Sequence, residues 1–163
     1  MSPDARLDHL LGGRPADLVA AIRASRMVFR VAYLLESRID EELVPFGIDM
    51  REYLALVLIA GDTGEPLRPS DLSFTLGATR TQITRLLDGL ERKGLVRRLP
   101  HQEDRRSLQL AHTDTGRDLL RRAVPPVHAA YRAGWSRVGM DDTRRALDLL
   151  RKVYDTLAPE DAR

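Results

Sequence analysis

The spacing of apolar residues predicts a long first helix over residues 15–46. Its apolar stripe recurs at helical intervals and consists of Val28, Ala32, Leu35, Ile39 and Leu43. Pro15 suits the first position of a helix, and Pro45 with Gly47 ends it. A helix of about 30 residues is longer than a small domain needs. We therefore expect part of it to pack against another chain.

Two shorter helices are predicted next. Asp49, followed three residues later by Glu52, is a capping-box pattern that opens the second helix. Pro69 opens a short third helix that ends at Gly77, and we expect it to be the first helix of a helix-turn-helix. Leu67, which lies between them, is expected to form a one-residue strand that pairs with a later hairpin.

The fourth predicted helix has the features of a DNA-recognition helix. Thr79 and Gln82 form another capping box, and Gly94 ends the helix. A narrow apolar seam is formed by Ile83, Leu86, Leu87 and Leu90. Off that seam, near the N-terminal end, lie Arg80, Thr81, Gln82, Thr84 and Arg85. Polar side chains at this end of a recognition helix meet base edges in the major groove.

A β-hairpin is predicted directly after this helix. Its strands are residues 95–99 and 107–111, with Leu108 and Leu110 facing inward. The tip between the strands, His-Gln-Glu-Asp-Arg-Arg, is too polar to be buried. A helix sized for the major groove beside a basic hairpin is the arrangement of a winged helix-turn-helix. The predicted fold is therefore mainly α with a small β-hairpin wing.

The C-terminal third is predicted to be helical as well. Thr113 caps a helix that Pro125 and Pro126 should interrupt and kink, because two backbone donors are lost there. Asp141 is expected to cap a last helix. Its apolar residues keep a 3-4-3 spacing like that of a coiled coil: Leu147, Leu150, Tyr154 and Leu157. That seam requires a partner.

The charges concentrate where the helix and the hairpin meet. The 163 residues carry a net charge of only +2, but residues 80–106 contain eight basic and four acidic residues, a local charge of +4. A local positive field suits a polyanion. Of the 26 basic residues 24 are arginine, which suits phosphate and guanine contacts but also follows from codon usage in a GC-rich genome.

Composition argues against several other functions. The chain has no cysteine, which excludes disulfides and thiolate metal sites, and its four histidines lack ligand spacing. We find no nucleophile–base pair, phosphate loop or carboxylate cluster, so neither an enzyme nor a cofactor is expected. Without a signal pattern or an apolar run of about 20 residues, a soluble cytoplasmic protein is expected.

Residues 18–157 resemble the MarR family of bacterial transcriptional regulators. The most specific stretch is RPSDLSFTLGATRTQITRLLDGLERKGLVRR, followed by EDRRSLQLAHTDTG. The family's wing pattern, Asp-x-Arg, five residues and Leu-Thr, is present as Asp104, Arg106 and Thr113, with His112 in place of the usual leucine. The chain is most similar to the EmrR/MprA branch, with which it shares PSxLSxxLGxxRT and the PPxH of residues 125–128.

The resemblance implies a homodimer that binds a pseudo-palindromic operator. It implies a dimerisation region of residues 15–46 and 113–158 and a DNA-binding domain of residues 47–112. Residues 1–14, with Gly12 and Gly13 near their end, are expected to form a flexible arm. It also implies repression that small aromatic or hydrophobic acids relieve, at genes for efflux or for the catabolism of aromatic acids. A constitutive or architectural DNA-binding protein without an effector and a helical dimerisation scaffold are the alternatives.

Twelve residues are predicted to contact DNA: Ser70, Thr79, Arg80, Thr81, Gln82, Thr84, Arg85, Arg97, Arg98, Asp104, Arg105 and Arg106. Gln82 would read adenine, Arg80 or Arg85 guanine, and the threonines phosphate or a thymine methyl. The resemblance places Arg106 in the minor groove with Asp104 orienting it. An exposed ion pair between these two is the alternative.

Five residues are candidates for the effector site: Arg23, Arg26, Tyr33, Tyr53 and His128. The resemblance makes the first two helices walls of the family's pocket. An arginine beside a tyrosine suits an aromatic carboxylate through a charge-assisted hydrogen bond and stacking. Core-edge or dimer packing is the alternative for the arginines and tyrosines, and a helix histidine with its own partners is the alternative for His128.

Overall fold

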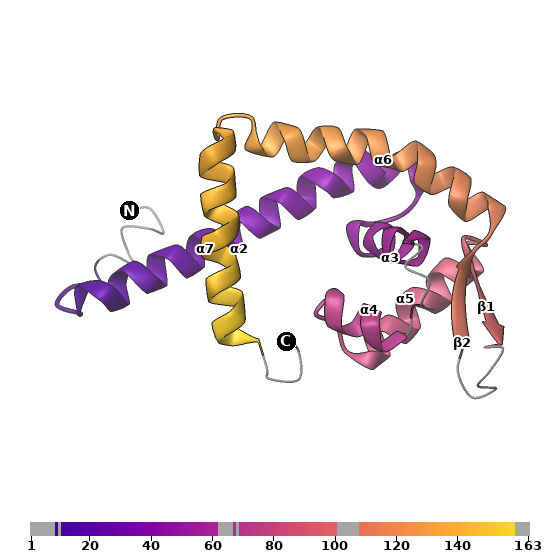
Figure 1. The fold of residues 1–163 in the computed structure, drawn as a ribbon, viewed down its shortest axis with the longest axis horizontal. Coiled ribbons are helices and arrows are strands. Elements are labelled where there is room, and N and C mark those ends of the chain that lie inside the picture. Colours follow the sequence, from indigo (N-terminus) through magenta and orange to yellow (C-terminus); the bar gives the residue numbers. More distant parts are fainter. Residues whose placement is uncertain (1–8, 10, 62–66, 68, 101–107, 159–163) are drawn as a thin grey trace. The chain divides into compact units, whose positions relative to one another are not determined.

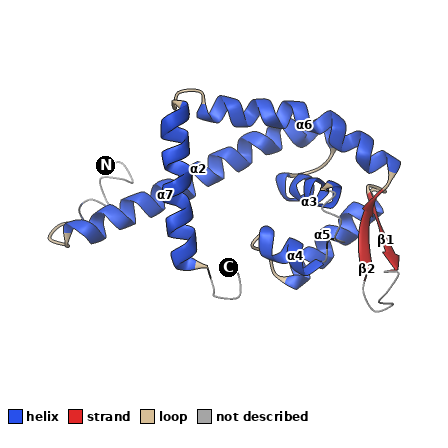
Figure 2. Cartoon of the chain, in the orientation of Figure 1, coloured by secondary structure: helices blue, strands red, loops and turns tan. Residues whose placement is uncertain are grey.

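A computed structural model describes residues 9, 11–61, 67, 69–100 and 108–158 of the protein. Figures 1 and 2 show its helices and strands. They are α2 (Ala16–Leu43), η1 (Val44–Phe46), α3 (Met50–Ala60), α4 (Pro69–Thr75), α5 (Arg80–Arg92), β1 (Val96–Pro100), β2 (Leu108–His112), α6 (Asp114–Trp135) and α7 (Met140–Leu157). The chain divides into two compact units, residues 1–37 and 38–163. The mainly helical fold with one small hairpin confirms the predicted class.

Helix α2 starts one residue after the predicted start, and the last three residues of the predicted helix form η1. The apolar stripe of α2 is buried only at its C-terminal end. Ile39 and Leu43 are fully enclosed, whereas Val28 is exposed. The helix passes into η1, and Gly47 then adopts a φ of 66°, a left-handed conformation that favours glycine. The chain turns at this glycine and leads into α3.

The N-terminus of α3 is held by two sets of acidic side chains. Asp49 accepts a hydrogen bond from the Glu52 amide at 2.8 Å, and the Glu52 side chain accepts one from the Asp49 amide at 3.2 Å, which confirms the predicted capping box. A second acceptor comes from α2, where Asp40 accepts from the Met50 amide at 2.7 Å. The end of α2 is thereby tied to the start of α3.

Strands β1 and β2 form an antiparallel hairpin in which Val96 pairs with His112 and Pro100 with Leu108. Both strands begin one residue later than predicted. The expected strand at Leu67 is wrong, because the sheet of the described residues has only these two strands. Leu67 instead packs its side chain against the hydrophobic core.

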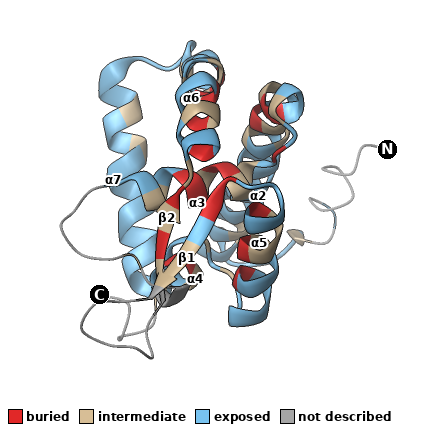
Figure 3. Ribbon diagram, turned by 90° about the vertical axis from the view of Figure 1, so that its right-hand side faces the viewer, coloured by how far each residue is buried: buried red, intermediate tan, exposed pale blue. Residues whose placement is uncertain are grey.

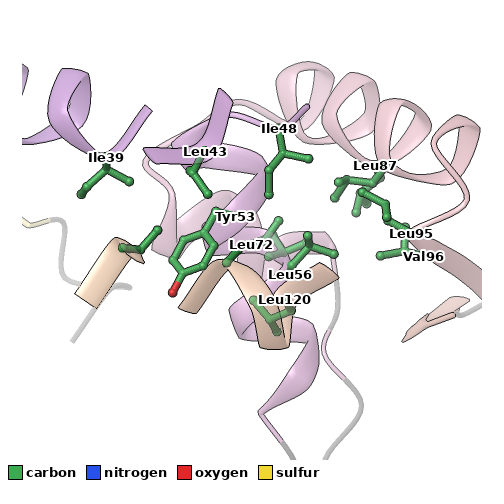
Figure 4. Packing of buried hydrophobic residues seen from close by; sticks show 14 of the residues in the cluster. Ile39, Leu43, Ile48, Tyr53, Leu56, Leu72, Leu87, Leu95, Val96 and Leu120 are labelled. Carbon is green, nitrogen blue, oxygen red and sulfur yellow. The ribbon is translucent and has the colours of Figure 1, made fainter. Parts of the chain in front are cut away.

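One hydrophobic core joins α3, α4, α5, α6, the hairpin and the end of α2. Its fully buried side chains include Ile39, Leu43, Leu56, Leu72, Ile83, Leu87, Leu90 and Val127. Figure 4 shows the ring of Tyr53 among the aliphatic side chains of this cluster. In Figure 3 the buried residues gather in α3, α5 and the hairpin. The core therefore fixes α5 against its neighbours in the same chain.

Helix α6 continues through Pro125 and Pro126, so the predicted interruption is wrong. The buried side chains of Ala123, Val127 and Ala130 lie on both sides of the prolines, and their packing holds the helix in one piece. Near its start, Gly116 lies so close to Leu95 that an added Cβ would be 1.9 Å from the Leu95 carbonyl oxygen. Only glycine allows this approach of α6 to the hairpin.

Helix α7 begins at Met140, one residue before the predicted cap Asp141. Its N-cap is Gly139, and Asp141 lies in the first turn, where its negative charge interacts favourably with the helix dipole. No residue of α7 is buried. Its predicted seam is exposed in this chain, with Leu147, Leu150, Tyr154 and Leu157 between 43% and 78% accessible.

Candidate nucleic-acid-binding surface

Helix α5 buries one face and exposes the other. Ile83, Leu87 and Leu90 are at most 2% accessible, which confirms the predicted seam. The opposite face carries the predicted polar set, and all five of its members are exposed: Arg80, Thr81, Gln82, Thr84 and Arg85. The buried seam holds the helix in place, and its N-terminal polar face stays accessible to a ligand.

Three of the candidate polar side chains are engaged within the helix. The Thr79 hydroxyl accepts a hydrogen bond from the Gln82 amide at 3.3 Å and donates to Gln82 Oε1 at 3.1 Å. Gln82 Oε1 also accepts from the Thr79 amide at 2.8 Å. Farther along, the Thr84 hydroxyl donates to the Arg80 carbonyl at 3.0 Å. Thr79 and Thr84 therefore have their hydroxyl protons in use and present mainly their methyl groups and lone pairs.

Arg80, Thr81 and Arg85 keep their donors available. Within the part of the chain that the structure describes, neither arginine makes an ion pair, and no hydrogen bond from the side chain of Thr81 is present. Each guanidinium offers five donors in a planar fork that matches phosphate oxygens or the guanine edge. The N-terminal half of α5 thus presents two guanidinium groups whose hydrogen-bond donors bind no other described residue.

Arg97 and Arg98 follow one another in β1 but have different surroundings. Arg98 forms ion pairs with Asp88 at 2.6 Å and Glu91 at 2.9 Å, both on α5, and its side chain is 27% accessible. Arg97 is exposed and has no ion pair with any described residue. The guanidinium of Arg98 therefore joins the hairpin to α5, and a DNA contact by this residue stays a prediction.

Lys93 holds the C-terminal end of α5. Its Nζ lies 2.7 Å from both carboxylate oxygens of Glu52 and 2.8 Å from the Gly47 carbonyl oxygen. Because Glu52 also belongs to the α3 capping box, α5 is linked to the corner between η1 and α3. The sequence analysis did not identify this contact, and 41 residues separate its partners, so no local spacing signals it.

His112 occupies the place of the family's leucine and is buried. Its Nε2 lies 2.8 Å from the Leu56 carbonyl oxygen of α3, and its Nδ1 has no hydrogen-bond partner among the described residues. Burial lowers the pKa of His112, and the nearby positive charge of Arg117 lowers it further. The neutral imidazole therefore anchors β2 to α3 by donating Nε2–H to that carbonyl.

Four predicted DNA-contact residues lie outside the described parts. Residues 101–107, which include Asp104, Arg105 and Arg106, are not described, and neither is the side chain of Ser70. Their roles stay predictions.

The predicted effector residues fall into two groups. Arg23, Arg26 and Tyr33 are exposed, and their spacing places them on one side of α2. His128 is exposed on α6. Tyr53, by contrast, is 3% accessible and belongs to the core, and burial, with a contribution from Tyr131, raises its pKa. The structure thus gives Tyr53 a packing role, and its contact with an effector stays a prediction.

Comparison with known proteins places this fold in a family. A profile of the MarR family matches residues 46–107. The transcriptional repressor MprA of Escherichia coli (strain K12) is 33% identical over 124 residues, which cover 76% of this chain and 70% of MprA. The chain belongs to the MarR family.

Two solved structures of similar fold add detail, and the first is of a MarR family transcriptional regulator. Sco3205 of Streptomyces coelicolor, solved in complex with DNA, is 28% identical with a TM-score of 0.77 and covers 85% of this chain and 88% of its own. CouR of Rhodococcus jostii RHA1, solved bound to p-coumaroyl-CoA, is 29% identical with a TM-score of 0.71 and covers 82% of this chain and 93% of its own. The winged-helix fold is therefore that of known transcriptional regulators.

Two further properties concern the described residues alone. None of their helices combines the length and the apolar character that crossing a bilayer requires. Among the same residues, no three histidine or acidic side chains are grouped so that they would hold a metal ion.

Proposed function

We propose that this protein is a transcriptional repressor that binds a pseudo-palindromic operator as a homodimer and releases it when a small aromatic or hydrophobic acid binds. The observation that carries the proposal is the N-terminal half of α5, where Arg80 and Arg85 are exposed and unpaired among the described residues while the opposite face is buried. Such a helix presents charged donors to the major groove without losing its own packing.

The apolar residues left exposed in the single chain support the homodimer. The apolar seam of α7 is exposed, and so are large apolar side chains of α2. Among the latter are Met27, Phe29 and Leu34, which are 57% to 73% accessible. Faces of this kind on soluble proteins mark interaction sites. A second copy would cover them and set two α5 helices at the separation of successive operator half-sites.

The effector is proposed from the arginine–tyrosine face of α2. Arg23 and Arg26 would bind a carboxylate and Tyr33 would stack on an aromatic ring. MprA is a named repressor and CouR was solved with a coumaroyl thioester, which supports a regulator that responds to a small molecule. The dimer would exchange between a geometry that binds DNA and one that does not. A ligand that binds the second geometry more tightly lowers operator affinity, at saturation, by the ratio of its affinities for the two geometries. Genes for efflux or for aromatic-acid catabolism are the proposed targets.

The DNA-binding proposal is tested with a labelled duplex from the promoter upstream of the protein's own gene. We expect binding that is sequence-selective and weakens steeply with salt. Arg80→Ala and Arg106→Ala should each weaken it at least tenfold, and Arg106→Ala should flatten the salt dependence. Arg132→Ala, an exposed arginine on α6, is the matched control and should bind like the wild type. Binding without sequence preference would contradict the proposal.

The effector is tested on the preformed complex. Aromatic carboxylic acids are titrated against the bound operator, and at least one should release it at saturating concentration. Arg26→Ala should shift this release to higher acid concentration without altering operator affinity in the absence of acid. Retention of DNA at saturation by every acid of a chemically varied panel would favour the constitutive DNA-binding alternative.

A further inference from the structure

The amide group of Gln82 is held in one orientation by the cap of the recognition helix. Its Oε1 accepts two hydrogen bonds, one from the Thr79 amide at 2.8 Å and one from the Thr79 hydroxyl at 3.1 Å. These two bonds use both lone pairs of the carbonyl oxygen. The side chain is exposed, so this orientation is set by the cap and not by surrounding protein.

The assignment of oxygen and nitrogen in this amide follows from its partner. The Thr79 backbone N–H can only donate, so the atom that faces it has to be the acceptor Oε1. The Thr79 hydroxyl accepts from the Gln82 backbone amide at 3.3 Å, and its own proton is then directed to Oε1. Exchanging the two atoms would place two donors against each other.

What remains for a ligand is the Nε2 group with its two hydrogens. A free glutamine reads adenine by donating to N7 and accepting from the N6 amino group, which requires both Nε2 and Oε1. In this protein Oε1 is already saturated. Guanine offers two acceptors on its major-groove edge, N7 and O6, whereas adenine and thymine offer one each and cytosine presents a donor.

We infer that Gln82 determines specificity as a donor-only residue and selects guanine at its contact position in the operator half-site. This inference rests on the proposed function, and it replaces the adenine contact predicted from the sequence. Its neighbours strengthen it, because Arg80 and Arg85 also carry donors and no acceptor. The exposed N-terminal face of α5 thus matches a half-site whose purine edges present acceptors.

The test uses a substitution that keeps the cap and removes the donors. Gln82→Glu retains a side-chain oxygen for the Thr79 amide, since glutamate is a natural partner in this capping box, but it has no Nε2 hydrogens. Gln82→Met removes the donors without adding charge and keeps a good helix former. Arg92→Gln, near the far end of α5, makes the same change of net charge as Gln82→Glu and is the matched control.

Each full-length protein is used to select from a random-sequence duplex library, and the selected site is then measured with each of the four bases at every position. For the wild type we expect one position at which guanine is preferred over adenine by about 5- to 100-fold. In Gln82→Glu and Gln82→Met that preference should fall to within about twofold, with cytosine rising in Gln82→Glu. Arg92→Gln should weaken binding to all DNA sequences by the same factor. Circular dichroism of each variant verifies that its helices are retained.

The outcomes separate the two proposals. Failure of the wild type to enrich any sequence removes the proposed function, and the inference with it. An enriched operator whose base preferences are the same in Gln82→Glu, Gln82→Met and the wild type removes the inference alone. The same holds if the position that responds to residue 82 prefers adenine, because the amide would then have left its cap to read the base.

Discussion

Helices α5 and α7 carry similar apolar seams and differ in what covers them. In α5 the seam residues Ile83, Leu87 and Leu90 are enclosed by the protein's own core. In α7 the seam residues Leu147 and Leu150 are about half accessible, and no residue of the helix is buried. Apolar periodicity therefore identifies the face of a helix that needs a partner. It does not say whether that partner belongs to the same chain.

The difference has a physical origin in the neighbours of each helix. Helix α5 lies between α4 and β1 and is tied to α3 by Lys93 and to the wing by Arg98. The apolar seam of α5 is therefore buried completely within one chain. Helix α7 is stabilised locally by ion pairs three residues apart, such as Arg144 with Asp141, which contribute little in water. Its apolar face is left for association.

The largest expected effect comes from replacing one leucine of each apolar seam by alanine. Leu87→Ala should lower the free energy of unfolding by about 2–5 kcal/mol, because it leaves a cavity in a closed core. Leu150→Ala should leave the folding of the protomer intact and weaken the dimer. Chemical denaturation at several protein concentrations measures both, since Leu87→Ala should lower the midpoint at every concentration, whereas weaker association should make the midpoint depend less on concentration.

A harsher substitution sharpens the same test. Leu150→Glu places a charge in the proposed dimer seam and should shift the protein to a monomer in analytical ultracentrifugation at micromolar concentration. Arg151→Glu, the neighbouring exposed position, is the charge-bearing control and should leave the dimer in place. A dimer that survives Leu150→Glu would mean that this part of α7 is not the association surface.

A smaller effect is expected from the two adjacent arginines of β1. Arg97→Gln should weaken DNA binding and reduce the salt slope by about one, as loss of a phosphate contact does. Arg98→Gln should weaken DNA binding by about tenfold with an unchanged salt slope, because its charge is already neutralised by Asp88 and Glu91. Fluorescence anisotropy over a range of salt concentrations separates the two.

The role of Arg98 has an independent check. Asp88→Asn removes one partner of the same ion pair without touching a basic residue, and it should reproduce part of the loss seen with Arg98→Gln. If Arg98→Gln instead reduced the salt slope as Arg97→Gln does, Arg98 would be a phosphate contact and its ion pairs would open on binding.

The smallest effect concerns the buried histidine that joins β2 to α3. Burial lowers the pKa of His112 from its ordinary value of 6.5, so below that pH the unfolded chain binds a proton that the folded protein does not. Stability should therefore fall as the pH decreases below about 6.5, by at most about 1.4 kcal/mol per pH unit. His112→Leu should flatten this dependence, as measured by urea denaturation between pH 5 and about pH 7.5.

The exposed His128 serves as the reference for that measurement. His128→Gln, at an exposed position on α6 that is not part of the hydrophobic core, should leave the pH dependence of the wild type unchanged. An equal slope in His112→Leu and the wild type would show that His112 is protonated in the folded protein.

Local hydrogen bonds made much of the fold predictable. The capping boxes at Asp49 and Thr79 join residues three apart, so their spacing in the sequence located the starts of α3 and α5. Gly47 and Gly77 marked helix ends because their φ values are positive, a conformation that other residues rarely adopt. The polar face of α5 followed from helical periodicity alone.

The clearest error, at the prolines of α6, occurred where distant residues decide. Helix α6 continues through Pro125 and Pro126 because Ala123 and Val127 are buried on each side, which no local rule for proline anticipates. At α7 the error is local: Asp141 was predicted as the cap, but the N-cap is Gly139 and Asp141 lies in the first turn.

The sequence by itself determined most of the helices, the caps of α3, α5 and α6, the hairpin and the face that α5 turns outward, since each depends on residues within about a turn of one another. Only the tertiary structure decided that Tyr53 is buried, that Arg98 pairs with α5, and that Lys93 reaches Glu52 across 41 residues of chain. Contacts of that range depend on how the core packs as a whole, and packing is a property of the assembled elements and not of any one segment.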